Sequence, residues 1–123
     1  RVDDRVVGLK HRYGWVAGSR PGGSGAMGEP GVVARYDMTD GSKTMHDFGA
    51  HSHPGEFVFV KDSDGAAEDE GWTMGFVYDD ANDSTDLVIL DGTDLSKPAV
   101  ARVHLPQRVP FGFHGSWIDD STM

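Results

Sequence analysis

The sequence predicts an all-β protein built from antiparallel sheets, and three observations support this. Seven or eight short runs rich in Val, Phe, Tyr and Trp are separated by turn residues. Seventeen glycines, with frequent Asp and Asn, are typical of tight turns between strands. No stretch shows the 3.6-residue spacing of an amphipathic helix. The spacing suits two successive four-stranded antiparallel sheets, as in propeller blades, while a lone sandwich or small barrel would fit it equally well.

The elements follow one another in a simple order. Residues 1–18 are expected to form a connector and then a short strand, and residues 19–30 a flexible glycine-rich loop. The main β region then covers residues 31–118. Its expected strands are 32–37, 43–48, 56–60, 72–78, 86–91, 100–105 and 111–118. Asp40–Gly41 is a hairpin-turn signal, and residues 62–71 read as an acidic loop.

Length and composition limit the classes of function. A chain of 123 residues is enough for one modest domain. The absence of cysteine excludes disulfides, thiolate nucleophiles and Cys-type zinc sites. A net charge of −9 is opposite in sign to that of a nucleic-acid binder. With no apolar run of about 20 residues and no recognisable signal peptide, we expect a soluble, cytoplasmic protein. Because the chain begins at Arg1 rather than Met, we also expect it to be a piece of a longer polypeptide.

The stretch 110–117 holds the first candidate for chemistry, His114. It lies between glycines and alternates with aromatic residues, as on a short strand packed into an apolar interior. An imidazole held in so stiff a setting suits a metal ligand. The alternative is a core histidine that hydrogen-bonds a carbonyl. The aromatic residues of the stretch are Phe111, Phe113 and Trp117.

A second cluster contains His51, His53 and Glu56. In a strand, His51 and His53 would share a face and could reach one metal, as in a cupin barrel that would also use Glu56 and His114. However, Pro54–Gly55 interrupts the strand after His53, and a one-residue slip sends a ligand to the opposite face. We therefore favour a solvated loop pair for His51 and His53.

Glu56 opens an apolar strand, where a buried carboxylate needs a cation or a hydrogen-bond donor. A metal-bound histidine supplies such a donor through its second ring nitrogen. A position in water at the strand end would remove that need, and the residues alone leave both interpretations open.

Several segments, taken together and in order, resemble a known family. The segments are 54–60, 68–72, 77–79, 87–91, 101–106 and 109–117. They resemble the C-terminal part of the carotenoid cleavage oxygenases, a family that includes the lignostilbene dioxygenases and the retinal-pigment-epithelium isomerase. The chain departs from the family pattern at Phe57 and at Lys61, where proline is usual.

The resemblance implies a specific fold and site. Members of the family are seven-bladed β-propellers that bind Fe(II) on the propeller axis through four histidines, which glutamates support. By this resemblance the chain is about the last two blades. His114 matches the last iron ligand, and Glu56 matches the glutamate that hydrogen-bonds it. The other three ligands would lie upstream, because the remaining histidines fall outside the family's ligand motifs.

The resemblance also implies a reaction, the oxidative cleavage by O2 of a C=C double bond in a carotenoid, apocarotenoid or stilbene. We expect an apolar polyene or stilbene as substrate, and peripheral membrane contact in the full-length parent. The fragment alone should be inactive, and its exposed strand edges favour self-association. A free-standing cupin-like metal-binding barrel and a non-catalytic β-module stay open as alternatives.

Overall fold

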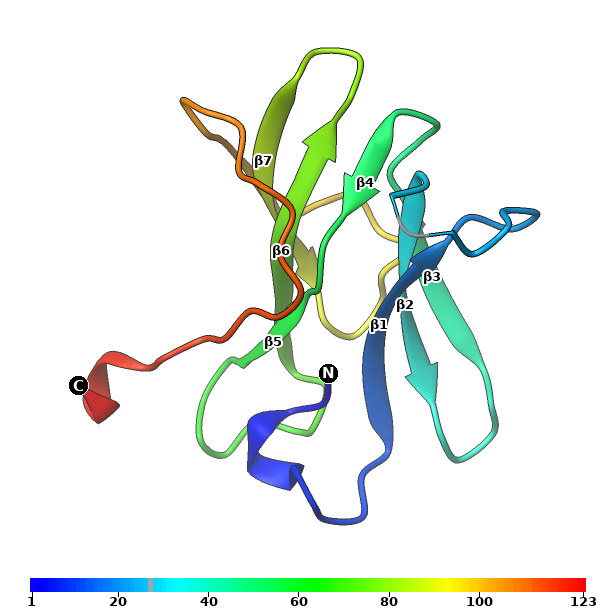
Figure 1. The fold of residues 1–123 in the computed structure, drawn as a ribbon. Coiled ribbons are helices and arrows are strands. Elements are labelled where there is room, and N and C mark those ends of the chain that lie inside the picture. Colours follow the sequence, from blue (N-terminus) through cyan, green and yellow to red (C-terminus); the bar gives the residue numbers. More distant parts are fainter. Residues whose placement is uncertain (27) are drawn as a thin grey trace.

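The computed structural model describes residues 1–26 and 28–123, which form an all-β chain of two antiparallel sheets side by side (Figure 1). The first sheet has the order β1-β2-β3. Two short 3₁₀ turns, η1 (Asp4–Val6) and η2 (Asp120–Thr122), lie near the two ends. No helix in the described part of the chain is long and apolar enough to span a bilayer. The strands of the first sheet are β1 (Tyr13–Ser19), β2 (Gly31–Asp37) and β3 (Lys43–Asp47).

The second sheet is centred on β6, which pairs with β7 on one side and with both β4 and β5 on the other. β4 and β5 are therefore two halves of one interrupted edge strand, and β8 forms the opposite edge. The sheet is four strand positions wide, as predicted, whereas the first sheet has three strands among the described residues rather than four. The strands are β4 (Ser52–Pro54), β5 (Val58–Lys61), β6 (Gly71–Asp79), β7 (Ser84–Asp91) and β8 (Ala101–His104).

The interruption between β4 and β5 is a β-bulge. Pro54 pairs with Val77 and Val58 pairs with Met74, so three residues of the edge strand lie opposite two residues of β6. An extra residue of this kind bends a strand and changes the direction of its side chains. The residue in the middle of the bulge is Glu56.

The core lies between the two sheets and joins them. Trp15 of β1 stacks on Phe59 of β5, with ring centroids 4.3 Å apart and an interplanar angle of 14°. Phe57 is also buried, and Leu95 is fully buried in the loop that follows β7. Burial of such large side chains is the main favourable contribution to folding. The sheet that carries Glu56 is thus fixed against its neighbour by two phenylalanines, Phe57 and Phe59, that closely follow that glutamate in the sequence.

Most predicted strands are confirmed within one or two residues. The Asp40–Gly41 turn is also confirmed, because Gly41 has a φ of +73°, a conformation that favours glycine. Residues 20–26 and 28–30 of the predicted glycine-rich loop contain no strand. Met27, within the same loop, lies outside the described residues. β4 (Ser52–Pro54) differs from the prediction, because Pro54 and Gly55 are residues that usually end regular structure.

The predicted strand 111–118 is wrong. Residues 105–118, which we name the C-terminal arm, contain no strand, and their aromatic side chains are exposed rather than packed into an interior. The arm crosses the second sheet near β5 and β6 and then extends away from the body (Figure 1). Because it crosses the sheet instead of running along an edge, its backbone has no ladder to join. The main β region therefore has its last strand at β8 rather than at 118.

Candidate functional site

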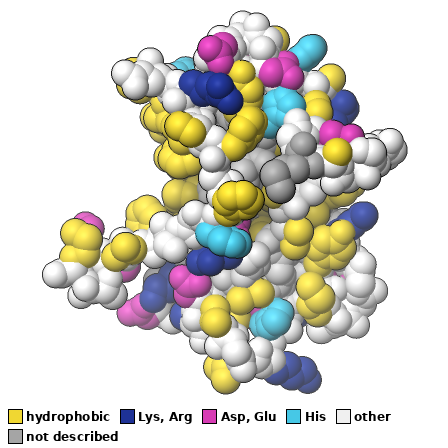
Figure 2. All heavy atoms as spheres, in the orientation of Figure 1, with side chains coloured by type: hydrophobic (Ala, Val, Ile, Leu, Met, Phe, Trp, Pro, Cys, Tyr) yellow, Lys and Arg dark blue, Asp and Glu magenta, His cyan; other side chains and the backbone are white. Residues whose placement is uncertain are grey.

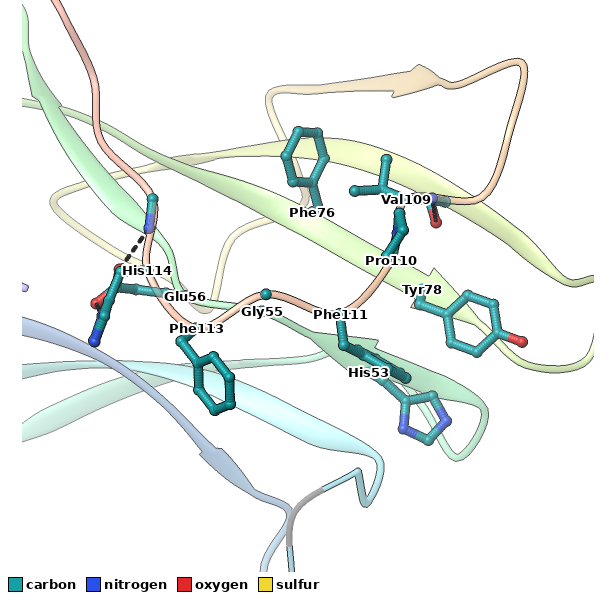
Figure 3. Close-up of a pocket in the computed structure, with 13 residues that line it drawn as sticks. His53, Gly55, Glu56, Phe76, Tyr78, Val109, Pro110, Phe111, Phe113 and His114 are labelled. Atoms are coloured by element: carbon teal, nitrogen blue, oxygen red, sulfur yellow. Dashed lines mark hydrogen bonds and ion pairs between the residues drawn. The ribbon is translucent and has the colours of Figure 1, made fainter.

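Glu56 and His114 meet although they are far apart in the sequence. Glu56 lies at the bulge between β4 and β5, and His114 lies in the C-terminal arm where it passes over that bulge. His114 Nδ1 is 3.4 Å from Glu56 Oε1, and the Gly115 N–H donates to Glu56 Oε2 at 2.9 Å. One carboxylate thus holds both the imidazole and the backbone that follows it. Figure 3 shows Glu56 and His114 together at one end of the site.

The surroundings keep the Glu56 carboxylate charged. Partial burial raises the pKa of Glu56, but the hydrogen bonds from the Gly115 N–H and from His114 outweigh it, and the pKa lies below its ordinary value. The side chain of Glu56 is 22% exposed, whereas that of His114 is 83% exposed. The carboxylate is therefore a fixed acceptor, and the second ring nitrogen of His114 is left accessible to a ligand.

Two grooves adjoin the pair. The first, of about 210 Å³, lies between the arm and the second sheet and is lined by Phe76 and Tyr78 of β6 and by arm residues. The second, of about 440 Å³, lies between the arm and β1. Both are lined by Glu56 and by Phe111 and Phe113. In Figure 2, hydrophobic side chains and a histidine lie together in the middle of this face.

His51 and His53 do not form the solvated pair that we predicted. Both histidines contact Asp80, which lies in the turn between β6 and β7. His51 Nδ1 is 2.8 Å from Asp80 Oδ1, and His53 Nε2 is 2.8 Å from Asp80 Oδ2. His51 is exposed, but the side chain of His53 is only 10% exposed, and its Nδ1 is buried with no hydrogen-bond partner among the described residues. In β4, His53 lies opposite Tyr78 of β6, and this pairing places the His53 side chain against the body of the protein.

The residues that the cupin alternative would use as metal ligands do not come together in the structure. His51 and His53 face Asp80, while Glu56 faces His114. Across residues 1–26 and 28–123, no group of three or more His, Asp or Glu side chains is placed to hold a metal ion. The remaining histidines are also separate from the pair. His46 contacts the Leu95 carbonyl, and His104 contacts Asp86.

Some contributors to the site were not predicted. The Gly115 N–H was missed because a backbone donor has no sequence signature. Arg108 was missed as well. Its guanidinium lies 4.4 Å from the Tyr78 ring centroid and 5.5 Å from that of Phe111. A basic residue three positions before an aromatic residue in the arm is the only signal that could have indicated it.

The chain is similar to known proteins over most of its length. Residues 1–119 match the sequence profile of the retinal pigment epithelial membrane protein family. This chain belongs to that family. It is 32% identical over 116 residues to apocarotenoid-15,15'-oxygenase of Synechocystis sp. and 37% identical over 121 residues to carotenoid cleavage oxygenase of Mycobacterium tuberculosis. These alignments cover 94% and 95% of this chain, and 23% of each relative.

Solved structures of the family share the fold. The chain superposes on a cobalt-substituted Synechocystis apocarotenoid oxygenase with a TM-score of 0.87 and 32% identity, covering 95% of this chain and 24% of that one. A chimera of the same enzyme with the retinal pigment epithelial protein gives a TM-score of 0.87 at 29% identity, with the same two coverages. The two sheets are therefore part of the propeller fold of this family. The chain spans about a quarter of the length of its relatives.

Proposed function

We propose that this chain is the C-terminal part of a non-haem Fe(II) dioxygenase that cleaves a C=C double bond of a carotenoid, apocarotenoid or stilbene. One observation carries the proposal: in a member of this family, Glu56 holds His114 and Gly115 at the bulge between β4 and β5. The relatives are named for cleavage of apocarotenoids and carotenoids, and another is a lignostilbene dioxygenase of Sphingomonas paucimobilis, 29% identical over 130 residues, 100% of this chain and 26% of that relative.

The residues present fit one quarter of an iron site. A metal-bound histidine usually donates its other ring N–H to a carboxylate, and His114 faces Glu56 in this way. The accessible nitrogen of His114 is a suitable donor for Fe(II). The solved structure of the cobalt-substituted Synechocystis apocarotenoid oxygenase supports a metal at the family's site. One imidazole does not hold Fe(II) tightly, so we propose that the remaining ligands come from other parts of the complete protein.

The chain's own residues have three tasks in this mechanism. Glu56 accepts a hydrogen bond from the Nδ1–H of His114, which leaves the other nitrogen free to bind the metal. The same carboxylate fixes the backbone at Gly115 and so the position of the ring. Phe111 and Phe113 of the arm line both adjoining grooves and would present an apolar surface to a polyene or stilbene. Iron, when bound, supplies the redox chemistry by which O2 reacts with a double bond.

The test is anaerobic reconstitution of the complete protein with Fe(II), followed by measurement of iron per chain and of cleavage products. We expect His114→Ala to abolish both. His104→Ala is the matched control, because His104 is as exposed as His114 and also lies beside a carboxylate, Asp86. It should retain iron and activity. Full activity of the His114→Ala protein would refute the assignment.

Glu56→Gln should lower iron affinity and activity less than His114→Ala does. Loss of a carboxylate that supports a ligand typically costs about 10–100-fold. The chain of residues 1–123 alone, which supplies one ligand, should bind less than one iron per chain and show no cleavage. Stoichiometric iron on this chain, lost on His114→Ala, would indicate a self-contained site and contradict the proposal.

A further inference from the structure

Very few backbone hydrogen bonds hold the C-terminal arm, the segment that contains His114. At its start the Leu105 N–H donates to the Thr85 carbonyl at 3.0 Å, and the Val109 N–H donates to Thr85 Oγ1 at 3.1 Å. The next backbone bond along the arm is that from Gly115 to Glu56. Residues 110–114 make no backbone hydrogen bond to the described part of the chain. Something else must therefore place the backbone that leads to the imidazole.

Side-chain packing at Phe111 fills that gap. The Phe111 ring meets the Tyr78 ring edge-on, with centroids 5.5 Å apart and an interplanar angle of 87°. It also meets the His53 ring at 6.3 Å and 72°. Arg108 lies over both Tyr78 and Phe111. Edge-to-face contacts and cation–π contacts of this kind are directional, so they fix the orientation of a ring as well as its location.

The surface that receives Phe111 is itself held by further hydrogen bonds. Tyr78 lies within β6, and its hydroxyl donates to Asp83 Oδ1 at 3.0 Å. His53 lies in β4 directly opposite Tyr78, is nine-tenths buried and bonds Asp80. We name His53 and Tyr78 the aromatic seat. Figure 3 shows Phe111 beside His53 and Tyr78 at one end of the site, with Glu56 and His114 at the other.

We propose that Phe111 is a positioning residue for His114. Three residues span at most about 10 Å, so the location of Phe111 limits where His114 can lie. With Phe111 in the aromatic seat and Gly115 bonded to Glu56, the backbone between them is held at both ends. Without Phe111, the free stretch would extend from Val109 to Gly115. This inference rests on the proposed function, since it treats His114 as a metal ligand.

The first test measures Fe(II) affinity of the complete protein with Phe111→Ala. In the chain of residues 1–123, where 60% of the Phe111 surface is exposed, Phe111→Ala should leave the melting temperature nearly unchanged. Fe(II) affinity should fall by about ten-fold, the lower end of the effect of losing a group that supports a ligand. Phe111→Tyr keeps the edge-to-face ring and should restore affinity. Ile118→Ala removes an equally exposed apolar side chain of the arm, four residues after His114, and should have no effect.

The second test uses the metal-free protein. Hydrogen exchange of the Gly115 amide, which donates to Glu56, should become about ten-fold faster in Phe111→Ala, while amides within β6 stay protected. Tyr78→Leu should reproduce the effect. The double variant should show little further change, because both substitutions break the same contact.

The outcomes separate the two proposals. Absence of iron from the unsubstituted protein would refute the proposed function. Iron binding that is equally tight in the unsubstituted and Phe111→Ala proteins, with unchanged Gly115 exchange, would overturn the positioning role alone. Fully additive effects of Phe111→Ala and Tyr78→Leu would also overturn it.

Discussion

Two segments without regular structure, the β5–β6 loop (62–70) and the C-terminal arm (105–118), are held in opposite ways. The loop is acidic and short, yet three other elements bind it. Arg5 donates to the backbone carbonyls of Ala66 and Ala67, and Arg35 pairs with Asp69. Glu68 accepts hydrogen bonds from two backbone N–H groups at the start of β1. The arm is rich in aromatic residues, and among the described residues its hydrogen bonds and ring contacts are few, mainly those with Thr85, the aromatic seat and Glu56.

The difference shows that hydrophobicity alone does not indicate which segment is fixed. The polar loop ties the second sheet to the first through charged hydrogen bonds, so it serves the fold. The apolar arm leaves most of its aromatic surface exposed. The candidate ligand His114 lies in residues 110–114, which make no backbone hydrogen bond to the described part of the chain. Substitutions in the loop should therefore change stability, whereas those in the arm should change the site.

The largest effect on stability is expected from Asp69→Ala. The side chains of Arg35 and Asp69 are only 12% and 18% exposed, so the substitution leaves a largely buried guanidinium without its partner. Such a loss costs about 3 kcal/mol in unfolding free energy. Urea unfolding measures it, and Asp62→Ala, on an exposed residue of the same loop, is the control. Equal stability of the two variants would contradict the role given to the loop.

A smaller effect on stability is expected at low pH from Asp37. Its carboxylate forms an ion pair with Arg12, which lies just before β1. Hydrogen bonds from Arg12 and then from Thr39 hold the pKa of Asp37 well below its ordinary value of 3.8. A lowered folded-state pKa gives stability that is present above the unfolded-state pKa and is lost as the pH falls through the folded-state pKa. Unfolding at a series of pH values below about 4 should show this loss, and Asp37→Asn should reduce it. If the unfolding free energy of Asp37→Asn fell with decreasing pH as steeply as that of the unsubstituted protein, the role of Asp37 in acid sensitivity would be contradicted.

The smallest effect on stability is expected from Phe113→Ala in the arm. The side chain is 77% exposed, and exposed substitutions usually change stability by less than about 0.5 kcal/mol. The same urea titration used for the loop provides the measurement. A loss comparable to that of Asp69→Ala would show that the arm supports the fold, and the contrast between the two segments would fail.

The sequence predicted most strands because alternation and turn residues act locally. It failed at β4 and at the arm, where the outcome depends on neighbours. Pro54 forms part of β4 because β6 is there to pair with it, and residues 111–118 form no strand because the arm crosses the sheet instead of pairing along an edge. The bond between His53 and Asp80 requires the register of β4 on β6, which spacing alone does not give.

For the candidate site, physical reasoning from Glu56 left burial and exposure equally open, and the resemblance brought in His114 as its partner. The contact between the two side chains agrees with that expectation. The arm that carries the histidine, its bond through Gly115 and its packing on Tyr78 could not be predicted, because each depends on a contact between distant segments.

The bulge at Glu56 makes one residue without a side chain as necessary as those with functional groups. A Cβ at Gly75 of β6 would lie 2.4 Å from Phe57 Cδ1 and 2.8 Å from the Glu56 carbonyl. Any larger residue at position 75 must displace the peptide that presents the carboxylate. A search for functional positions that considers only reactive side chains would pass over Gly75. A change to alanine at Gly75 would therefore displace Glu56 while every residue with site chemistry stayed intact.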